Sequence, residues 1–231
     1  LTITPFHEPI QQAALQVLEP AALQRSHLAL ARALLDGGGD DAERIARHMH
    51  AAGREDEAVE HASAAAYAAS KALAFDHAAE LYRFAISCKP AQWSLHKHCA
   101  EALVQAGRGA EAAPLFLAAA DSAPAAAAAG LRREAAEQYL GNGYLDRGAE
   151  ILRPLLRDAG IEVPEQARDR NAQLVAHTER VVRRGLGFHE RSEFEISRRD
   201  LHRIDLCWAA GKGLLLNDPV RSGYFLAQCT Y

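Results

Sequence analysis

Two groups of histidines are the first candidates for metal chemistry in this sequence. They are His48-Met49-His50 and His96-Lys97-His98-Cys99. Residues i and i+2 of a helix point about 200° apart, so neither histidine pair holds an ion alone. His96 and Cys99 share a helix face, but two ligands do not make a site. We therefore expect surface histidines, no metal and no cofactor, and stoichiometric zinc in the purified protein would contradict this.

Gly211-Lys212-Gly213 is the nearest approach to a phosphate-binding loop. That signature requires Gly five residues before the Gly-Lys pair and Ser or Thr after it. Leu206 and Gly213 stand at those places, inside a predicted helix. The sequence also has no catalytic-loop or metal-binding signature of a protein kinase. We expect no phosphate-transfer chemistry in this stretch of chain.

Acid–base and nucleophilic catalysis have equally little support. Nothing in the sequence places a carboxylate pair in a pocket, and no nucleophile has a neighbouring base. The carboxylate pairs are Glu134 with Glu137 and Asp40 with Asp41. The residues that could form a catalytic triad are His7, Ser26 and Asp36. Helix-surface and capping roles explain them, so the chain is predicted not to be an enzyme.

A basic stretch follows residue 180 and is the candidate for nucleic-acid binding. Acidic residues alternate with its arginines, which favours a solvated, salt-bridged surface. The net charge of −4 gives no overall attraction to phosphate backbones. The arginines are at positions 180, 183, 184, 191, 198, 199 and 203, and the acidic residues are at 179, 190, 193, 195 and 200. We expect no nucleic-acid partner.

The elements that would position any site show a repeated pattern between residues 75 and 124. Four positions of one helix recur, and each lies 34 residues after its counterpart. The first set is Ala78, Tyr82, Ala85 and Pro90, and the second is Ala112, Phe116, Ala119 and Pro124. Spacings i, i+4 and i+7 share a helix face, on which small residues admit a neighbouring helix and the aromatic fills the groove. The period predicts helix pairs that stack because one pair cannot bury its apolar face alone.

The resulting fold prediction is all-α, an antiparallel helix-pair solenoid of about a dozen helices. A short strand at residues 1–5 and a helix from Glu8 precede a helix that starts at Pro20 and ends at Gly37-Gly38-Gly39. The other predicted helices cover 42–52, 55–73, 75–89, 91–106, 109–122, 125–142, 145–159, 164–184, from Ser197 through Leu214, and from Asp218-Pro219 onward. Leu174, Val175, Val181 and Val182 are the predicted core residues of the 164–184 helix, and Phe188 to Ile196 is a predicted loop.

The stretches Phe75-Asp76-His77-Ala78-Ala79-Glu80-Leu81-Tyr82 and Gly107 to Phe116 resemble the second helix of a tetratricopeptide repeat. Ala100 and Leu103, and Ala136 and Tyr139, match that family's first helices. A third unit departs from the pattern, with Gly148, Leu152 and Leu155 at the packing positions, an offset of 36 and Gly160 in place of Pro.

A second resemblance concerns bacterial STAND-class signalling ATPases, in which a winged-helix-like module is followed by helical repeats. It rests on Phe6 to Ala14, Arg25 to Ala31, Ala46 to Gly53, Ile204 to Trp208 and Asn217 to Arg221. The last two segments are similar to kinase-linked members. The resemblance implies residues 1–36 as the end of that module, 40–160 as tetratricopeptide-like repeats and 161–231 as degenerate repeats.

The resemblance also implies a binding surface, because first helices line the concave face of such arrays. Through the register above, the candidate positions are Glu60, Ser63, Tyr67, Lys71, Ser94, Lys97, Glu101, Arg133 and Glu137. They are mostly polar and of mixed sign, which suits a peptide or protein, or another domain of the parent chain. The alternative, that this face is only solvent-lined or covered, stays open.

Composition narrows the setting. The four cysteines, Cys88, Cys99, Cys207 and Cys229, form no C-x-x-C pair and are predicted to be buried free thiols of a reducing compartment. No apolar run approaches the ~20 residues that span a bilayer, and no signal peptide is recognisable. We expect a cytoplasmic protein without a membrane partner, and a fragment of a longer chain.

The resemblance therefore implies a non-catalytic protein–protein interaction and sensor region of a multidomain bacterial signalling ATPase or Ser/Thr kinase. The alternative is the regulatory domain of a transcription activator that binds a small inducer. An apolar pocket with convergent polar groups would favour the small molecule, whereas an open polar groove would favour a protein.

Overall fold

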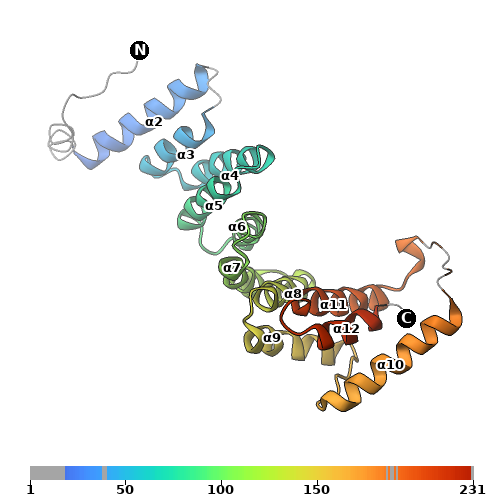
Figure 1. Ribbon diagram of the computed structural model, residues 1–231. Coiled ribbons are helices and arrows are strands. Elements are labelled where there is room, and N and C mark those ends of the chain that lie inside the picture. The colour runs from blue at the N-terminus through green and yellow to red at the C-terminus, as the bar shows by residue number, and fades with distance from the viewer. Residues whose placement is uncertain (1–18, 38–40, 186, 188–189, 191, 230–231) are drawn as a thin grey trace. The chain divides into compact units, whose positions relative to one another are not determined.

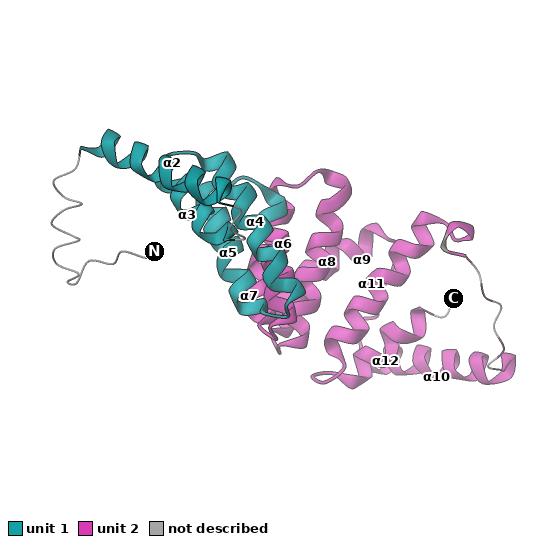
Figure 2. Ribbon diagram, turned by 90° about the horizontal axis from the view of Figure 1, so that it is seen from above, with its two compact units in different colours: residues 1–95 teal, residues 96–231 magenta. Residues whose placement is uncertain are grey.

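The computed structural model describes residues 19–37, 41–185, 187, 190 and 192–229, and over these residues the protein is all-α (Figure 1). No strand occurs in these ranges, and none of their helices is long and apolar enough to cross a lipid bilayer. The predicted strand at 1–5 and the helix from Glu8 lie outside the described residues. The chain divides into two compact units, Leu1–Leu95 and His96–Tyr231 (Figure 2), a division that differs from the predicted domain boundaries.

The helices up to α9 follow one another with short connections, whereas longer segments join α9 to α10 and α10 to α11. The first unit holds α2 (Pro20–Asp36), α3 (Ala42–Ala51), α4 (Glu55–Lys71) and α5 (Phe75–Cys88), and α6 (Trp93–Gln105) begins at its end. The second unit holds α7 (Gly109–Ser122), α8 (Ala125–Gly141), α9 (Leu145–Asp158), α10 (Ala167–Arg184), a 3₁₀ turn (Glu193–Glu195), α11 (Arg198–Leu214) and α12 (Pro219–Gln228). In each unit, chain neighbours pack on one another, α2 on α3, α3 on α4, α4 on α5, α7 on α8 and α8 on α9.

Several helix starts occur where the sequence predicts them, and each has a local cause. Pro20 occupies the first position of α2, where its missing N–H is not needed. The side chains of Asp41, Ser197 and Asp218 each accept a backbone N–H of the first turn, from Arg44, Asp200 and Arg221 respectively. These caps satisfy donors that would otherwise lack a partner.

The repeated small and aromatic positions form core, as predicted. Ala78, Ala85, Ala112 and Ala119 are fully buried. The aromatic residues between them are buried as well, with Tyr82 7 % and Phe116 2 % exposed. The first-helix positions and those of the degenerate unit are also buried, namely Ala100, Leu103, Ala136, Tyr139, Gly148, Leu152 and Leu155.

The turns inside the helix pairs require a left-handed backbone. Gly53, Gly107 and Gly143 have φ of +73°, +76° and +84°, a region that glycine enters without steric cost. In the α4–α5 turn the same role falls to Leu73, at φ +60°. Leu73 lies 34 residues before Gly107, so the repeat keeps the backbone geometry while one copy lacks the glycine.

The second unit departs from packing between chain neighbours alone. Helix α11 returns to pack on α8 and α9, and α12 packs on α11 and α10 (Figure 1). The approach of α11 to α8 is close, because a Cβ on Gly213 would lie 2.8 Å from Leu140 Cβ. A cluster of larger apolar side chains fills this region, including Leu140, Leu152, Leu156, Leu206 and Phe225.

Helix α10 differs from its prediction in two respects. It begins at Ala167 rather than at Pro164, so residues 161–164 run without helical structure. Val175 and Val182, predicted as core, are 57 % and 74 % exposed. The buried side chains of this helix are instead Arg170 and His177. Leu174, also predicted as core, is half-buried and lies against Gly223 of α12. The inner face of α10 therefore combines this leucine with polar residues, which hydropathy alone does not select.

Candidate ligand-binding site

The predicted concave-face positions of the first unit lie on α4 and at the start of α6. Glu60 is exposed, and Ser63 is half-buried. Tyr67 is 60 % exposed, and the Lys71 ammonium lies 5.4 Å from the centre of its ring. The hydroxyl oxygen of Ser94 accepts a hydrogen bond of 3.3 Å from the Gln92 amide. Of these five residues, Tyr67 and Lys71 are brought into contact.

The remaining positions lie in the second unit and are engaged in ion pairs. Lys97 bonds Glu101 within α6 at 3.1 Å, and Arg133 approaches Glu134 at 3.6 Å. Glu137 accepts from the Lys212 ammonium of α11 at 2.7 Å, and its side chain is only 13 % exposed. At this point α11 covers the predicted face, so Glu137 is not part of an open surface.

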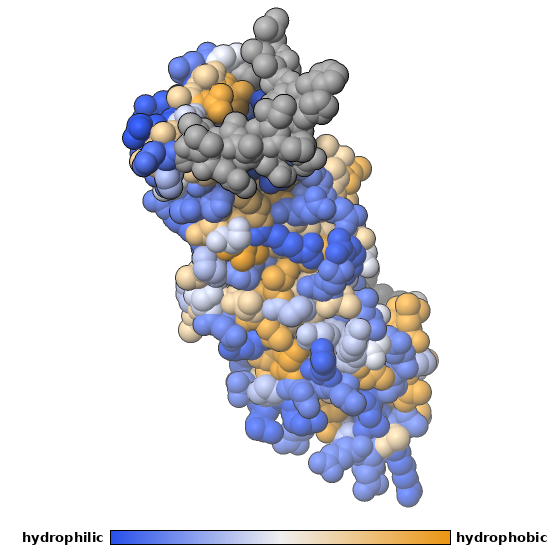
Figure 3. All heavy atoms as spheres, turned by 90° about the vertical axis from the view of Figure 1, so that its left-hand side faces the viewer, coloured by the Kyte–Doolittle hydropathy of each residue, from blue (hydrophilic) through white to orange (hydrophobic). Residues whose placement is uncertain are grey.

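The neighbouring Glu134 carries the clearest electrostatic shift of this group. Burial raises the pKa of its carboxyl, and the nearby Glu101 and Glu137 act in the same direction, against Arg133 and Lys97. Keeping Glu134 ionised at neutral pH therefore costs stability. On the face of the molecule shown in Figure 3, hydrophilic residues lie beside smaller hydrophobic areas.

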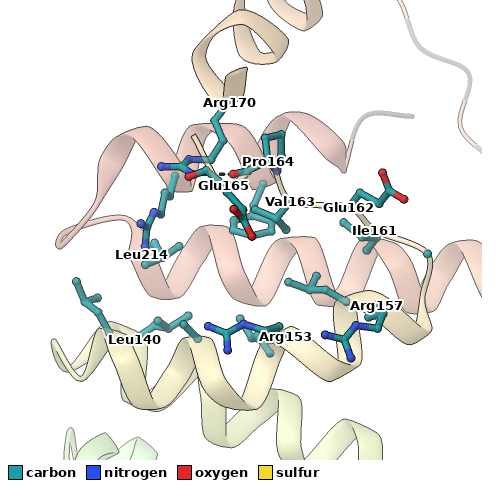
Figure 4. A pocket seen from close by; sticks show the side chains of 17 residues that line it. Leu140, Arg153, Arg157, Ile161, Glu162, Val163, Pro164, Glu165, Arg170 and Leu214 are labelled. Carbon is teal, nitrogen blue, oxygen red and sulfur yellow. Dashed lines mark hydrogen bonds between the residues drawn. The ribbon is translucent and has the colours of Figure 1, made fainter. Parts of the chain in front are cut away.

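A concave space in the second unit lies beside α9 rather than on the first helices. It is a cavity of about 890 Å³ between α9, residues 160–165, and parts of α8, α10, α11 and α12 (Figure 4). Its apolar lining comes from Leu140, Leu145, Ala149, Leu152, Leu156, Ile161, Val163, Pro164, Leu214 and Phe225. A volume of this size falls in the ~300–1,000 Å³ range of small-molecule sites.

Four arginines complete the lining, against two glutamates, Glu162 and Glu165, which are both exposed. Arg153 and Arg157 stand one turn apart on α9, and neither forms an ion pair with any residue that the structure describes. Arg221 is bound to Asp218 at 3.3 Å. Figure 4 shows Arg153 and Arg157 on α9 and Arg170 entering from the opposite side of the cavity.

Arg170 is the most unusual of these groups because its side chain is buried, at 9 % exposure. Its Nη1 donates to the carbonyl oxygens of Pro164 and Glu165, both at 2.6 Å. Its Nε has no hydrogen-bond partner among the described residues. A buried guanidinium with backbone carbonyls as its acceptors keeps its full charge and a spare donor, which favours an anion nearby.

A tyrosine fixes the segment that Arg170 holds. The Tyr224 hydroxyl of α12 donates to the Glu162 carbonyl at 3.0 Å. Burial raises the pKa of Tyr224, with Cys207 acting in the same direction, so this hydroxyl remains a donor at neutral pH. Three carbonyl groups of residues 162–165 thus accept hydrogen bonds from side chains of α10 and α12. These bonds fix the position of this non-helical segment, which forms one wall of the cavity.

The cavity lining offers groups that suit the binding of an anion with an apolar body. Its lining residues include no Ser, Thr, Cys, His, Lys or Tyr. The guanidiniums provide fork-shaped donors for a carboxylate or phosphate. The leucines and Phe225 provide surface that an apolar body would cover.

None of the four cavity arginines was singled out from the sequence. Arg153 and Arg157 follow the i, i+4 spacing of an ordinary solvated helix face, and Arg170 lies among other charged residues of α10. The sequence signal is the departure from the 34-residue repeat in the third unit, where Leu152 and Leu155 stand at packing positions. That signal marks the region without identifying its chemistry.

The glycines around Lys212 have a packing role. A Cβ on Gly211 would meet the Leu226 side chain at 2.7 Å, and one on Gly213 would meet the Glu137 carbonyl oxygen at 3.1 Å. Both lie inside α11, which agrees with the rejection of a phosphate loop. These glycines allow α12 and α8 to approach α11 closely.

None of the four cysteines, all within the described residues, forms a disulfide. Cys99 and Cys207 are buried as predicted, whereas Cys88 and Cys229 are half-buried. Burial raises the pKa of Cys207 to about 12 and, together with Glu55, that of Cys88 to about 11. With no metal ion bound, the thiols of Cys207 and Cys88 are therefore protonated at neutral pH.

No protein-family model matches the chain, and no curated protein is similar enough to count as a relative. The family resemblances of individual segments thus stay hypotheses.

Proposed function

We propose that this chain is a non-catalytic ligand-recognition region whose second unit binds a small amphipathic organic anion between α9 and α10. The observation that carries the proposal is the placement of Arg153, Arg157 and Arg170 around an apolar cavity. None of the three forms an ion pair with a described residue, and Arg170 is buried with a spare Nε donor.

Arg170 is buried beside an apolar cavity and loses hydration, and an anion that accepts its hydrogen bonds offsets that loss. Arg153 and Arg157 are exposed, and they add charged donors to the same cavity. Arginine binds carboxylates in a two-point geometry that lysine cannot reproduce. A ligand with one anionic head and an apolar body would satisfy both halves of the lining at once.

In the wider setting, we propose that the helices form a tetratricopeptide-like array that acts as the sensor of a signalling ATPase or Ser/Thr kinase in the cytoplasm. The 34-residue recurrence and the successive packing of neighbouring helices support this. A ligand that bridges α9 and residues 160–165 would stiffen the wall of the cavity. In arrays with few contacts between distant helices, such a local change alters curvature.

The direct test is calorimetric titration of the whole chain with octanoate and, separately, with 1-octanol. These probes share an apolar body and differ in charge, so the arginines predict clearly tighter binding of octanoate. Replacing both α9 arginines (Arg153→Ala with Arg157→Ala) should weaken octanoate about tenfold or more, since a hydrogen bond to a charged group contributes about 1.5–3 kcal/mol. The weak affinity for 1-octanol should change little.

The matched control is Arg147→Ala. Arg147 is on the same helix but does not line the cavity, and its guanidinium lies over Tyr139 and Tyr144. This variant removes a positive charge of the same helix and should leave octanoate affinity as it is. Equal binding of the two probes, or equal losses in the control and the double variant, would show that the cavity is not an anion site.

A protein partner on α4 is the second candidate. Tyr67 is a large, exposed aromatic with a cation beside its ring, and aromatic residues are the commonest anchors of interfaces. Crosslinking from a photoreactive group placed at Ala68, an exposed neighbour, would capture such a partner. Loss of capture in Tyr67→Ala would assign the anchor, and unchanged capture would exclude it.

A further inference from the structure

Donor side chains from three successive helices meet at one end of the first unit. His50 lies near the end of α3, Glu55 is the first residue of α4 and Cys88 is the last residue of α5. The His50 Nδ1 is 2.9 Å from Glu55 Oε2 and 3.4 Å from Cys88 Sγ. The three donor atoms lie within 4.8 Å of one another.

The fold explains why they meet. The α3–α4 turn passes through Gly53 at φ +73°, which returns the chain so that Glu55 faces His50. Helix α5 packs on α4, and after the turn at Leu73 its last residue lies beside the first residue of α4. The His50 ring is also held in orientation by Phe84, edge to face, with ring centres 5.4 Å apart.

The geometry distinguishes a ligand set from a catalytic triad. In a triad the nucleophile and the carboxylate contact opposite nitrogens of the imidazole. Here Cys88 Sγ and Glu55 Oε2 both approach the same nitrogen, Nδ1. One ring nitrogen cannot relay a proton between two partners on the same side, so the three groups converge on a common point instead.

We propose that His50, Glu55 and Cys88 bind a divalent transition-metal ion of the zinc class. Ligands of a tetrahedral zinc ion with Zn–S of ~2.3 Å and Zn–N of ~2.0 Å lie about 3.3–3.6 Å apart. The His50–Cys88 separation of 3.4 Å falls in this range, whereas His50 and Glu55, at the hydrogen-bond distance of 2.9 Å, would have to move slightly apart to admit the ion. Imidazole, thiolate and carboxylate together favour Zn²⁺ over Mg²⁺ or Ca²⁺. The described residues supply three ligands, which leaves a fourth position for water or an added donor.

The neighbouring charges do not compete for this point. The Lys89 ammonium, next to Cys88, is bound to Asp56, and Arg54 is bound to Glu57. The sequence prediction that adjacent histidines do not chelate together is unaffected, because His50 acts here with Glu55 and Cys88 and not with His48. The prediction of no metal is the one that this proposal replaces.

A bound ion would join the end of α3, the start of α4 and the end of α5. Since the three ligands come together in the folded chain, metal binding stabilises the first unit by mass action. The site is separate from the cavity in the second unit, and its test is independent of organic-anion binding.

The test is titration of the whole chain with Co²⁺ alone, under a reductant that contains no thiol. A thiolate ligand gives a sulfur-to-cobalt charge-transfer band in the near ultraviolet, and Zn²⁺ added afterwards should abolish it. Cys88→Ser should remove the band, and Glu55→Gln and His50→Ala should weaken Co²⁺ binding about tenfold to a hundredfold, as the loss of one coordinating group does. Addition of Zn²⁺ alone should raise the melting temperature of the unmodified protein.

Cys229→Ser is the matched control, because Cys229 is also half-buried but belongs to the second unit. It should retain the band in full. Helical circular dichroism verifies that each variant folds, and Glu55→Gln, at a partly exposed position, guards against a folding defect in Cys88→Ser. The proposal is wrong if the unmodified protein shows no charge-transfer band. It is also wrong if the band persists in Cys88→Ser and disappears in Cys229→Ser. In either case the three residues form a hydrogen-bonded cluster and not a metal site.

Discussion

The regular repeats and the region from α9 to α12 solve the same packing problem with side chains of different size. At 78, 85, 112 and 119 the core positions are alanines with no exposed surface. From α9 onward the core also holds alanines such as Ala210, but leucines and aromatics such as Leu152 and Phe225 fill most of it. The 890 Å³ cavity lies entirely among residues 140–225. Small side chains let helices meet closely, whereas larger ones on helices of less regular order leave space between them.

This difference indicates which part of the chain is the better candidate for a binding site. The positions that recur every 34 residues are used for packing, and their regularity reflects that constraint. The α8–α9 pair departs from the recurrence, with Leu152 and Leu155 at packing positions, and Leu152 also lines the cavity. Irregularity in the repeat therefore marks the candidate site better than any motif.

The largest expected effect belongs to the regular side of the comparison. Phe116 is 2 % exposed between two buried alanines, so Phe116→Ala should cost about 3–5 kcal/mol of unfolding free energy. Urea denaturation followed by circular dichroism measures this, and octanoate affinity should be unchanged at temperatures where the variant is folded. An unaltered denaturation midpoint would refute the assigned register.

Gly148→Ala tests the place where the two regions join. A Cβ at this position would lie 2.5 Å from Leu140 Cγ and 3.1 Å from the Ala136 carbonyl oxygen. Such overpacking costs about 1–3 kcal/mol, and because Leu140 lines the cavity, octanoate should also bind more weakly. Gly130→Ala is the control, since nothing lies within 4 Å of the added methyl. A stability loss without a change in octanoate affinity would separate the packing from the site.

Leu73→Gly compares the two copies of the repeat directly. Leu73 holds φ +60°, where Gly107 stands in the second copy. Relief of the left-handed strain, about 1–2 kcal/mol, exceeds the entropy lost to glycine, about 0.5–1 kcal/mol. A gain of up to about 1 kcal/mol should result, whereas Gly107→Leu should destabilise the chain. Destabilisation by Leu73→Gly would mean that contacts of the leucine outweigh the strain.

The smallest expected effect is a difference between the two units in how their stability depends on pH. The His27 and His48 Nδ1 atoms are 2.9 Å apart, so one ring must accept without a proton. Burial, and then His27, lower the pKa of His48 below 6.5. At pH values below 6.5 the unfolded chain therefore binds more protons at His48 than the folded chain does. The contribution of neutral His48 to folding stability is fully present above pH 6.5 and is lost as pH falls through the folded-state pKa of His48.

Glu134 in the second unit works in the opposite direction. The pKa of its carboxyl is raised in the folded chain. The contribution of protonated Glu134 to folding stability is therefore present below pH 4.5 and is lost as pH rises through the folded-state pKa. Thermal melts at neutral and mildly acidic pH should show a smaller acid sensitivity in His48→Gln, and a gain at neutral pH in Glu134→Gln. If the melting temperatures of His48→Gln and the unmodified protein depend on pH in the same way, the histidine pair does not contribute to acid sensitivity.

Local rules predicted much of the fold and little of the site. Pro20, Asp41, Ser197 and Asp218 set helix starts because their effects act within one turn. The buried faces of α5 and α7 followed from periodicity. The burial of Arg170 and the exposure of Val175 could not be foreseen, since they depend on where α12 packs. The cavity likewise requires α11 to return to α8, a contact between residues more than seventy positions apart in sequence, as in the Asn217 side chain donating to the Leu140 carbonyl.

Hydrogen–deuterium exchange of the whole chain with and without octanoate tests the central claim most directly. The account predicts slower exchange in residues 152–170 and 219–228, which surround the cavity, and unchanged exchange in α4 and α5. The Arg153→Ala, Arg157→Ala double variant should lose this protection, and Arg147→Ala should keep it. Protection centred on α4 and α5, or none near the cavity at octanoate concentrations that give calorimetric saturation, would contradict the assignment of the site to the irregular region.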